Sequence, residues 1–86
     1  MKYIIPGVYV HYKGPSYVVV GMAHHHETRQ PMVVYFPVMP HAPGEIPCWN
    51  LRPIDGPDGW LTPVTVGNQS LERFRFLHPI LTSGGR

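Results

Sequence analysis

The chain has 86 residues, fewer than a typical domain, so it has room for one core only. Its formal net charge is only +2 and its basic residues are scattered from Lys2 to Arg86, a pattern that argues against nucleic-acid binding. The single cysteine, Cys48, excludes an internal disulfide framework; it fits a reducing compartment and is expected to be a small buried side chain.

The first residues of the chain carry one basic side chain, Lys2, followed by a short apolar run at residues 3–5. This run is far too short for the core of a signal peptide or for a membrane span. We therefore expect a cytoplasmic protein with no membrane association.

Short apolar or alternating segments separated by Gly and Pro predict closely spaced β-strands. The second of these segments is apolar on both faces, which favours a central place in the sheet, and Gly21 within it indicates a bulge. The last segment could also form a helix, but the alternation of its Arg and Phe residues favours a strand. The predicted strands are residues 8–12, 17–23, 32–38, 48–52, 60–66 and 71–77.

Turn-forming residues mark the connections between these segments. Pro37 should end the third strand or place it at an edge, and three prolines at positions 39–47 predict an extended, exposed loop. Residues 53–59 are too rich in Pro, Gly and Asp for a strand, and residues 67–70 predict a hairpin connection.

The strand pattern predicts one all-β domain over residues 1–79, followed by a flexible tail at residues 80–86. Five to six short antiparallel strands in so short a chain are typical of a small SH3-like barrel. Closure of the barrel would remove the exposed strand edges that such a sheet could not otherwise protect.

The chain contains a succession of short blocks: HYKG at 11–14, YVVVGMA at 17–23, His25, Glu27-Thr28, PMVVY at 31–35, Trp49, Arg52-Pro53 and Arg73-Phe74. In this order the blocks resemble the DUF1653 family of short, uncharacterised bacterial and phage domains. The resemblance covers roughly residues 7 to 79 and implies an SH3-like β domain of unknown function. The chain departs from the family pattern in its Pro-rich segment and in residues 55–59, and such loops often carry specificity.

Polar residues within these blocks predict a binding pocket. His25, Glu27 and Thr28 would form its edge, although Glu27 and Thr28 would equally cap a turn through hydrogen bonds to the backbone. The planar guanidinium of Arg52 could hold a carboxylate or phosphate through two hydrogen bonds, and Lys13 could add a positive charge.

Aromatic residues could complete this pocket. Tyr12, Trp49 or Trp60 would stack on a planar group of the ligand, although each also suits a position in the core. The expected ligand is therefore small and anionic or nucleotide-like, and no cofactor is predicted.

The three consecutive histidines suggest a weaker alternative, a metal site. In a strand, His24 and His26 would project to one face, with Glu27, His41 or Cys48 as a third ligand. Such a site would make the protein a metal-dependent hydrolase. Polar residues at a strand end explain the triplet equally well.

The chain therefore leaves three functions open. The first is a non-catalytic binding module, for which sequestration of a host signal by a phage protein is one conceivable use. The second is a protein-interaction or self-assembly module that uses an exposed strand and the Pro-rich loop and could form a homo-oligomer. The third is the metal-dependent hydrolase. Because neither a nucleophile elbow nor a Gly-rich phosphate loop occurs, we expect a protein that is not an enzyme.

Overall fold

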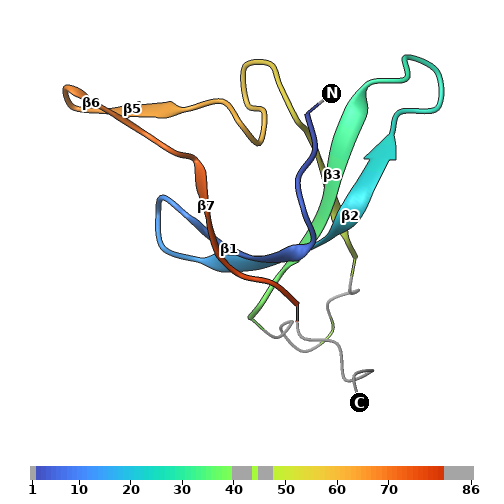
Figure 1. Cartoon of the computed structure of the whole chain (residues 1–86), viewed down its shortest axis with the longest axis horizontal. Coiled ribbons are helices and arrows are strands. Elements are labelled where there is room, and N and C mark those ends of the chain that lie inside the picture. The colour runs from blue at the N-terminus through green and yellow to red at the C-terminus, as the bar shows by residue number, and fades with distance from the viewer. Residues whose placement is uncertain (1, 40–43, 45–47, 81–86) are drawn as a thin grey trace.

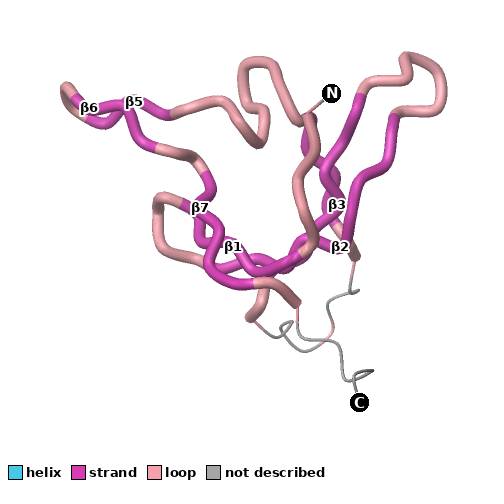
Figure 2. The backbone as a smooth tube through the Cα atoms, in the orientation of Figure 1, coloured by secondary structure: helices cyan, strands magenta, loops and turns pink. Residues whose placement is uncertain are grey.

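A computed structural model describes residues 2–39, 44 and 48–80, and within them the chain is all β with no helix (Figure 2). The all-β class predicted from the sequence is thus confirmed. The predicted Pro-rich loop lies largely outside the described residues, as does the predicted tail from residue 81 onward. The seven strands are β1 (Gly7–His11), β2 (Ser16–His24), β3 (Pro31–Pro37), β4 (Asn50–Pro53), β5 (Val64–Val66), β6 (Gln69–Leu71) and β7 (Phe74–His78).

Five of the strands form one antiparallel sheet in the order β4-β3-β2-β1-β7 (Figure 1). As predicted, the apolar strand β2 is central, with β1 and β3 on its two sides. The register between β2 and β3 shifts between Val19 and Gly21, which confirms the bulge. Strand β3 ends at Pro37, as expected for a residue that lacks a backbone N–H.

The sheet does not close into a barrel. Its two edge strands, β4 and β7, are not joined by backbone pairing, although they approach each other through side chains: the Arg52 guanidinium carbon lies 5.3 Å from the centre of the Phe74 ring. The predicted closure is wrong because the chain leaves the sheet after β4. It passes through a turn segment at residues 54–62, and the next two strands pair only with each other.

These two strands, β5 and β6, form a hairpin that projects away from the sheet (Figure 1). The hairpin connection predicted at residues 67–70 is confirmed, but it contains only two residues, Gly67 and Asn68. Gly67 has φ 62°, the left-handed value that a tight two-residue turn requires and that glycine adopts without strain. Strand β6 was not predicted. The strand predicted at residues 60–66 is reduced to Val64–Val66.

The core lies on one face of the sheet, where alternate residues of β1, β2, β3 and β7 point inward. Trp60 is only 2% exposed and stacks flat on Phe74, with ring centres 3.6 Å apart. The Tyr9 ring meets Trp60 edge to face, and its hydroxyl donates to the carbonyl of Ile5 at 2.8 Å. The core comprises Ile4, Tyr9, Val19, Val33, Tyr35, Ile54, Trp60 and Phe74.

The last strand of the sheet is β7, so the strand prediction for this segment is confirmed over the helix. It pairs with β1, with His11 opposite Phe74 and Tyr9 opposite Phe76. In the described part of the chain, no helix is long and apolar enough to cross a membrane.

Candidate functional site

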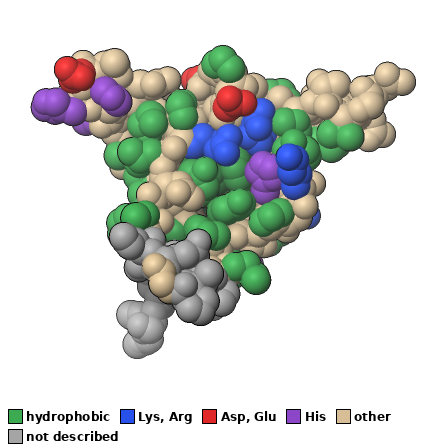
Figure 3. Space-filling view, turned by 180° about the vertical axis from the view of Figure 1, so that it is seen from behind, with side chains coloured by type: hydrophobic (Ala, Val, Ile, Leu, Met, Phe, Trp, Pro, Cys, Tyr) green, Lys and Arg blue, Asp and Glu red, His purple; other side chains and the backbone are tan. Residues whose placement is uncertain are grey.

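A hollow of about 570 Å³ lies beside the core, on the face of the sheet toward which the core side chains point. Strands β1 to β4 each contribute to it, together with the β1–β2 turn, the turn segment and the residue before β7. Figure 3 shows Lys and Arg side chains gathered beside a histidine among hydrophobic side chains on one face of the molecule. The hollow is lined by His11, Tyr12, Lys13, Tyr17, Tyr35, Leu51, Arg52, Pro53, Asp58 and Arg73.

Three of these lining residues, Lys13, Arg52 and Arg73, are cations, and they come from three distant parts of the sequence. Asp58 is the one carboxylate in the lining. The ion pair found among the described residues is that of Lys2 with Asp55, elsewhere on the molecule, so no ion pair within that part of the chain neutralises the three cations. The hollow therefore carries an excess of positive charge.

The Arg52 side chain is fixed by three contacts. Its Nε donates to the Tyr35 hydroxyl at 3.3 Å, its Nη1 donates to the Asp58 carbonyl at 2.8 Å, and its guanidinium lies over the ring of Phe74. Its Nη2 has no hydrogen-bond partner among the residues that the structure describes. A guanidinium held in this way loses little conformational freedom when it binds an anion.

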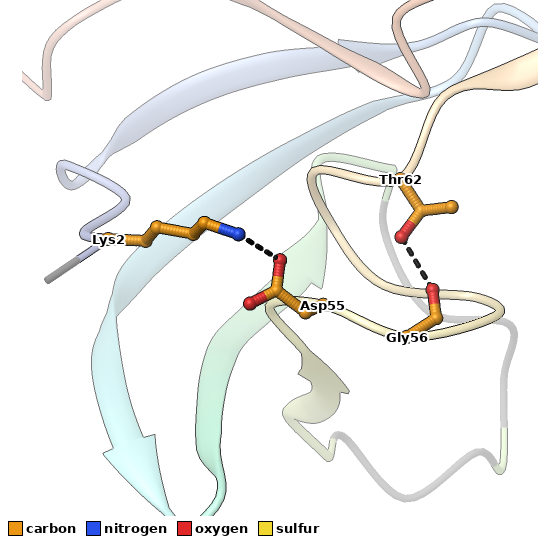
Figure 4. A network of polar contacts seen from close by, with 4 residues as sticks. All are labelled: Lys2, Asp55, Gly56 and Thr62. Atoms are coloured by element: carbon orange, nitrogen blue, oxygen red, sulfur yellow. Dashed lines mark hydrogen bonds and ion pairs between the residues drawn. The ribbon is translucent and has the colours of Figure 1, made fainter.

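Arg73 is anchored to the turn segment at residues 54–62, where its Nε donates to the carbonyl of Thr62 at 3.1 Å. The Thr62 hydroxyl in turn donates to the carbonyl of Gly56, and Lys2 forms its 2.8 Å ion pair with Asp55 (Figure 4). These contacts fold the turn segment onto itself and onto the start of the chain. The segment thereby positions both arginines of the hollow.

His11 stands among the three cations. Its Nδ1 accepts a hydrogen bond from the backbone N–H of Lys13 at 3.2 Å, which places the ring proton on Nε2 in the neutral form. Burial lowers the pKa of His11 below its ordinary value, and the positive charges of Arg52, Arg73 and Lys13 lower it further. The imidazole is therefore a neutral donor within a cationic site.

Tyrosine rings form much of the remaining wall. The rings of His11 and Tyr12 are 4.6 Å apart at their centres, and Tyr17 meets Tyr35 edge to face at 5.4 Å. The Lys13 ammonium lies 5.8 Å from the centre of the Tyr12 ring. The hollow thus offers aromatic surface next to its positive charges.

The structure brings together only three of the predicted site residues: Tyr12, Lys13 and Arg52 all line the hollow. His25, Glu27 and Thr28 lie in the exposed turn between β2 and β3, at the opposite end of β2 from the β1–β2 turn (Figure 1).

The β2–β3 turn is held by its own polar groups. The His25 Nδ1 accepts from the backbone N–H groups of Glu27 and Thr28, and the Thr28 hydroxyl accepts from Gln30 N–H. This agrees with the capping role that the sequence suggested for Thr28. Arg29 in this turn has φ 64°, which is uncommon for a residue other than glycine.

The two tryptophans also lie outside the hollow. Trp49 is 63% exposed and stacks on Phe36, which points to the face of β3 opposite Tyr35. Trp60 is part of the core. Neither ring is available to stack on a ligand in this hollow.

The geometry predicted for a metal site at His24 and His26 does not form. Strand β2 ends at His24, so the two side chains do not share one face of a strand. Within residues 2–39, 44 and 48–80, no three His, Cys, Asp or Glu side chains are grouped to hold a metal ion. His41 lies outside the described residues, and Cys48, expected to be buried, is exposed.

Sequence reasoning missed seven of the ten residues that line the hollow, and four of these seven are the polar and aromatic residues His11, Tyr17, Tyr35 and Arg73. All four belong to the blocks that carry the family resemblance, as do Tyr12, Lys13, Arg52 and Pro53. The useful signal was therefore the set of polar and aromatic residues shared by several blocks. Asp58 carried no such signal, since it lies in a segment where the chain departs from the family pattern.

Comparisons with known proteins agree with this architecture. Residues 7–76 match the model of a family described as "Protein of unknown function (DUF1653)". A crystal structure of a DUF1653 protein from Bordetella bronchiseptica is similar at a TM-score of 0.70 and 30% sequence identity, over 93% of this chain and 95% of that one. No match was found among curated proteins.

Proposed function

The chain belongs to the DUF1653 family, and from its hollow we propose that it is a non-catalytic domain that binds a small anionic, nucleotide-like ligand. The observation that supports this most strongly is the convergence of Lys13, Arg52 and Arg73 on one hollow with a single carboxylate, Asp58. Uncompensated cations in a concave site favour an anionic ligand.

A phosphate group suits this site better than a carboxylate does. A phosphate presents three terminal oxygens, and the lining of the hollow holds three cationic side chains, Lys13, Arg52 and Arg73, together with the imidazole of His11. A carboxylate has only two oxygens and would leave part of this set without a partner. The proposed ligand is therefore a phosphate ester.

The tyrosines supply the contact for the organic part of this ligand. The Tyr12 ring lines the hollow, and its centre is 5.8 Å from the Lys13 ammonium, so a planar ring that stacks on Tyr12 would place an attached phosphate near that charge. Binding of a phosphate next to a planar ring is the chemistry of nucleotide recognition.

An SH3-like architecture is part of the same proposal. The five-stranded sheet bends until its edge strands β4 and β7 meet through Arg52 and Phe74, which supports a half-open barrel. The hollow would then lie in the opening between these edges. This arrangement places a binding site where the barrel is incomplete.

The proposal predicts that Lys13→Gln weakens binding of a nucleoside monophosphate by at least about tenfold, since a hydrogen bond to a charged group contributes about 1.5–3 kcal/mol. Thermal-shift screening of nucleotides and sugar phosphates would select the compound, and calorimetry would measure its affinity. The matched control is Arg29→Gln, which removes one positive charge from the β2–β3 turn. Stabilisation by no compound, or equal weakening by both substitutions, would contradict the proposal.

A second candidate function is self-assembly through the β5–β6 hairpin. The hairpin pairs with no other strand in the described residues, and an isolated two-stranded hairpin is only marginally stable in water. Its register puts the apolar residues Val64, Val66 and Leu71 on one face, together with Gln69 opposite Val66, and Val66 is 49% exposed. A second copy of the chain could cover this apolar face.

Light scattering on the full chain over a range of concentrations tests this candidate. Self-assembly predicts a dimer that Val66→Lys converts to a monomer, whereas Thr65→Lys, on the polar face of the same strand, leaves it intact. A monomer at every concentration would exclude assembly through the hairpin.

A further inference from the structure

We propose that His11 takes up a proton when the hollow binds its anion, so that anion affinity rises as the pH falls from about 8 to about 6. This inference rests on the proposed function and adds a form of regulation to it. The proton comes from the solvent, and no covalent bond of the ligand changes.

The charges around His11 set the direction of this coupling. Lys13 approaches from the β1–β2 turn, Arg52 from β4 and Arg73 from the residue before β7, and all three disfavour a fourth positive charge. A bound dianion reverses the local field and favours the imidazolium. The other titratable groups near His11 are Tyr12, Tyr17, Tyr35 and Asp58 in this hollow, with Glu72 and Arg75 in an adjoining hollow that His11 also lines.

The coupling has to act in both directions. If the anion increases the affinity of His11 for a proton by some factor, the proton increases the affinity of the hollow for the anion by the same factor. In the empty state, burial and the three cations hold the pKa of His11 below its ordinary value. The empty hollow therefore disfavours the imidazolium form of His11, and a bound anion would oppose that effect.

The β1–β2 turn can accommodate the protonated ring. Protonation of Nδ1 ends its role as acceptor for the Lys13 N–H, but two backbone hydrogen bonds still hold the turn. His11 N–H donates to the Pro15 carbonyl at 2.8 Å, and Gly14 N–H donates to the His11 carbonyl at 2.7 Å. The ring can thus change its charge without unfolding the site.

His25 provides an internal control. Its Nδ1 also accepts backbone N–H groups two and three residues ahead, in the turn at the other end of β2. It therefore shares the local hydrogen-bond pattern of His11 but does not line the hollow. A bound anion should therefore change the protonation of His11 and leave that of His25 unchanged.

The test is an NMR titration of the histidine Hε1 signals of the full chain, with inorganic sulfate as the probe and sodium chloride at matched ionic strength as the reference. Sulfate stays a dianion over this range, whereas the second pKa of a phosphate ester is about 6 and would add its own titration. We expect sulfate to raise the titration midpoint of His11 by about one pH unit, equivalent to about a tenfold gain in affinity. The His25 curve should be the same in both salts.

The outcomes separate the two proposals. If sulfate shifts the Lys13 backbone N–H and Arg73 Nε–H signals while the His11 midpoint stays fixed, proton coupling is wrong and the anion site stands. Equal movement of His11 and His25 would show a general salt effect and would also overturn the coupling. If no sulfate concentration perturbs the hollow, the anion site itself is wrong.

Discussion

At the scale of single residues, the hollow is built from side chains that the core also uses. Phe74 stacks on Trp60 in the core and lies beneath the guanidinium of Arg52. Tyr35 is buried, yet its hydroxyl accepts a hydrogen bond from the same arginine. The position of Arg52 is therefore fixed by well-packed aromatic rings, and substitution of these rings would disturb the site together with the fold.

His11 should make the empty protein sensitive to acid. Burial, followed by the charges of Arg52, Arg73 and Lys13, lowers its native pKa, so the unfolded chain binds the proton more readily than the folded one. The contribution of neutral His11 to the free energy of unfolding is fully present above the pKa of the unfolded chain, about 6.5. It is lost as the pH falls from that value through the lower pKa of His11 in the folded protein.

Melting temperatures measured between about pH 8 and about pH 5 check this sign, because they span the ordinary histidine pKa. We expect the Tm of the wild type to fall more steeply below about pH 6.5 than that of His11→Asn. The asparagine side chain does not titrate and can still accept a hydrogen bond from the Lys13 N–H. Parallel curves for the two proteins would show that His11 has no such effect.

At the scale of elements, the turn segment at residues 54–62 connects the fold to the site. Trp60 N–H donates to the Pro53 carbonyl and Leu61 N–H to that of Ile54, which folds the segment back toward the end of β4. The carbonyl groups of Asp58 and Thr62 then accept from Arg52 and Arg73. A distortion of this segment should therefore affect stability and anion binding together.

Gly59→Ala tests this connection, because a Cβ atom at this buried position would overlap the backbone of Asp55. We expect a loss of about 1–3 kcal/mol in the free energy of unfolding, measured with urea, and weaker phosphate binding. Gly21→Ala is the control, since its Cβ would enter open space at the bulge of β2. Equal stability of the two variants would contradict the role given to the segment.

The elements that local sequence patterns predict well are the long strands. Residues 8–12, 17–23 and 32–38 agree with β1, β2 and β3 to within one residue at every end, since alternation and β-branched runs are local signals. The strand predicted at residues 60–66 is too long at its start, because Trp60 lies in the core and stacks on Phe74. This contact joins distant parts of the chain, so a local sequence pattern does not reveal it.

The topology of the sheet explains why the predicted site residues lie in two separate places. Strands β1, β2 and β3 are consecutive and antiparallel, so their two connecting turns lie at opposite ends of β2. At roughly 3.3 Å per residue, a strand of nine residues separates those ends by about 30 Å. Lys13 and His25 could not share a pocket, although their blocks are close in the sequence.

At the scale of the whole molecule, folding concentrates a charge that the sequence disperses. The net charge of +2 indicated a weak electrostatic footprint, yet three of the seven basic residues meet in one hollow. The prediction against nucleic-acid binding was based on the total charge of the chain. A small anion, in contrast, responds to the electrostatic field inside the hollow, which is set by the charges that line it. The fold thus creates a site that composition alone could not indicate.

An NMR titration of the wild-type chain with inorganic phosphate shows whether this hollow binds phosphate. We predict saturable shifts in the backbone N–H signals of Tyr12 and Lys13 and in the Nε–H signals of Arg52 and Arg73, while residues 24–31 stay unperturbed. Shifts confined to the β2–β3 turn, or no saturable shift anywhere, would contradict the assignment of the hollow as the binding site.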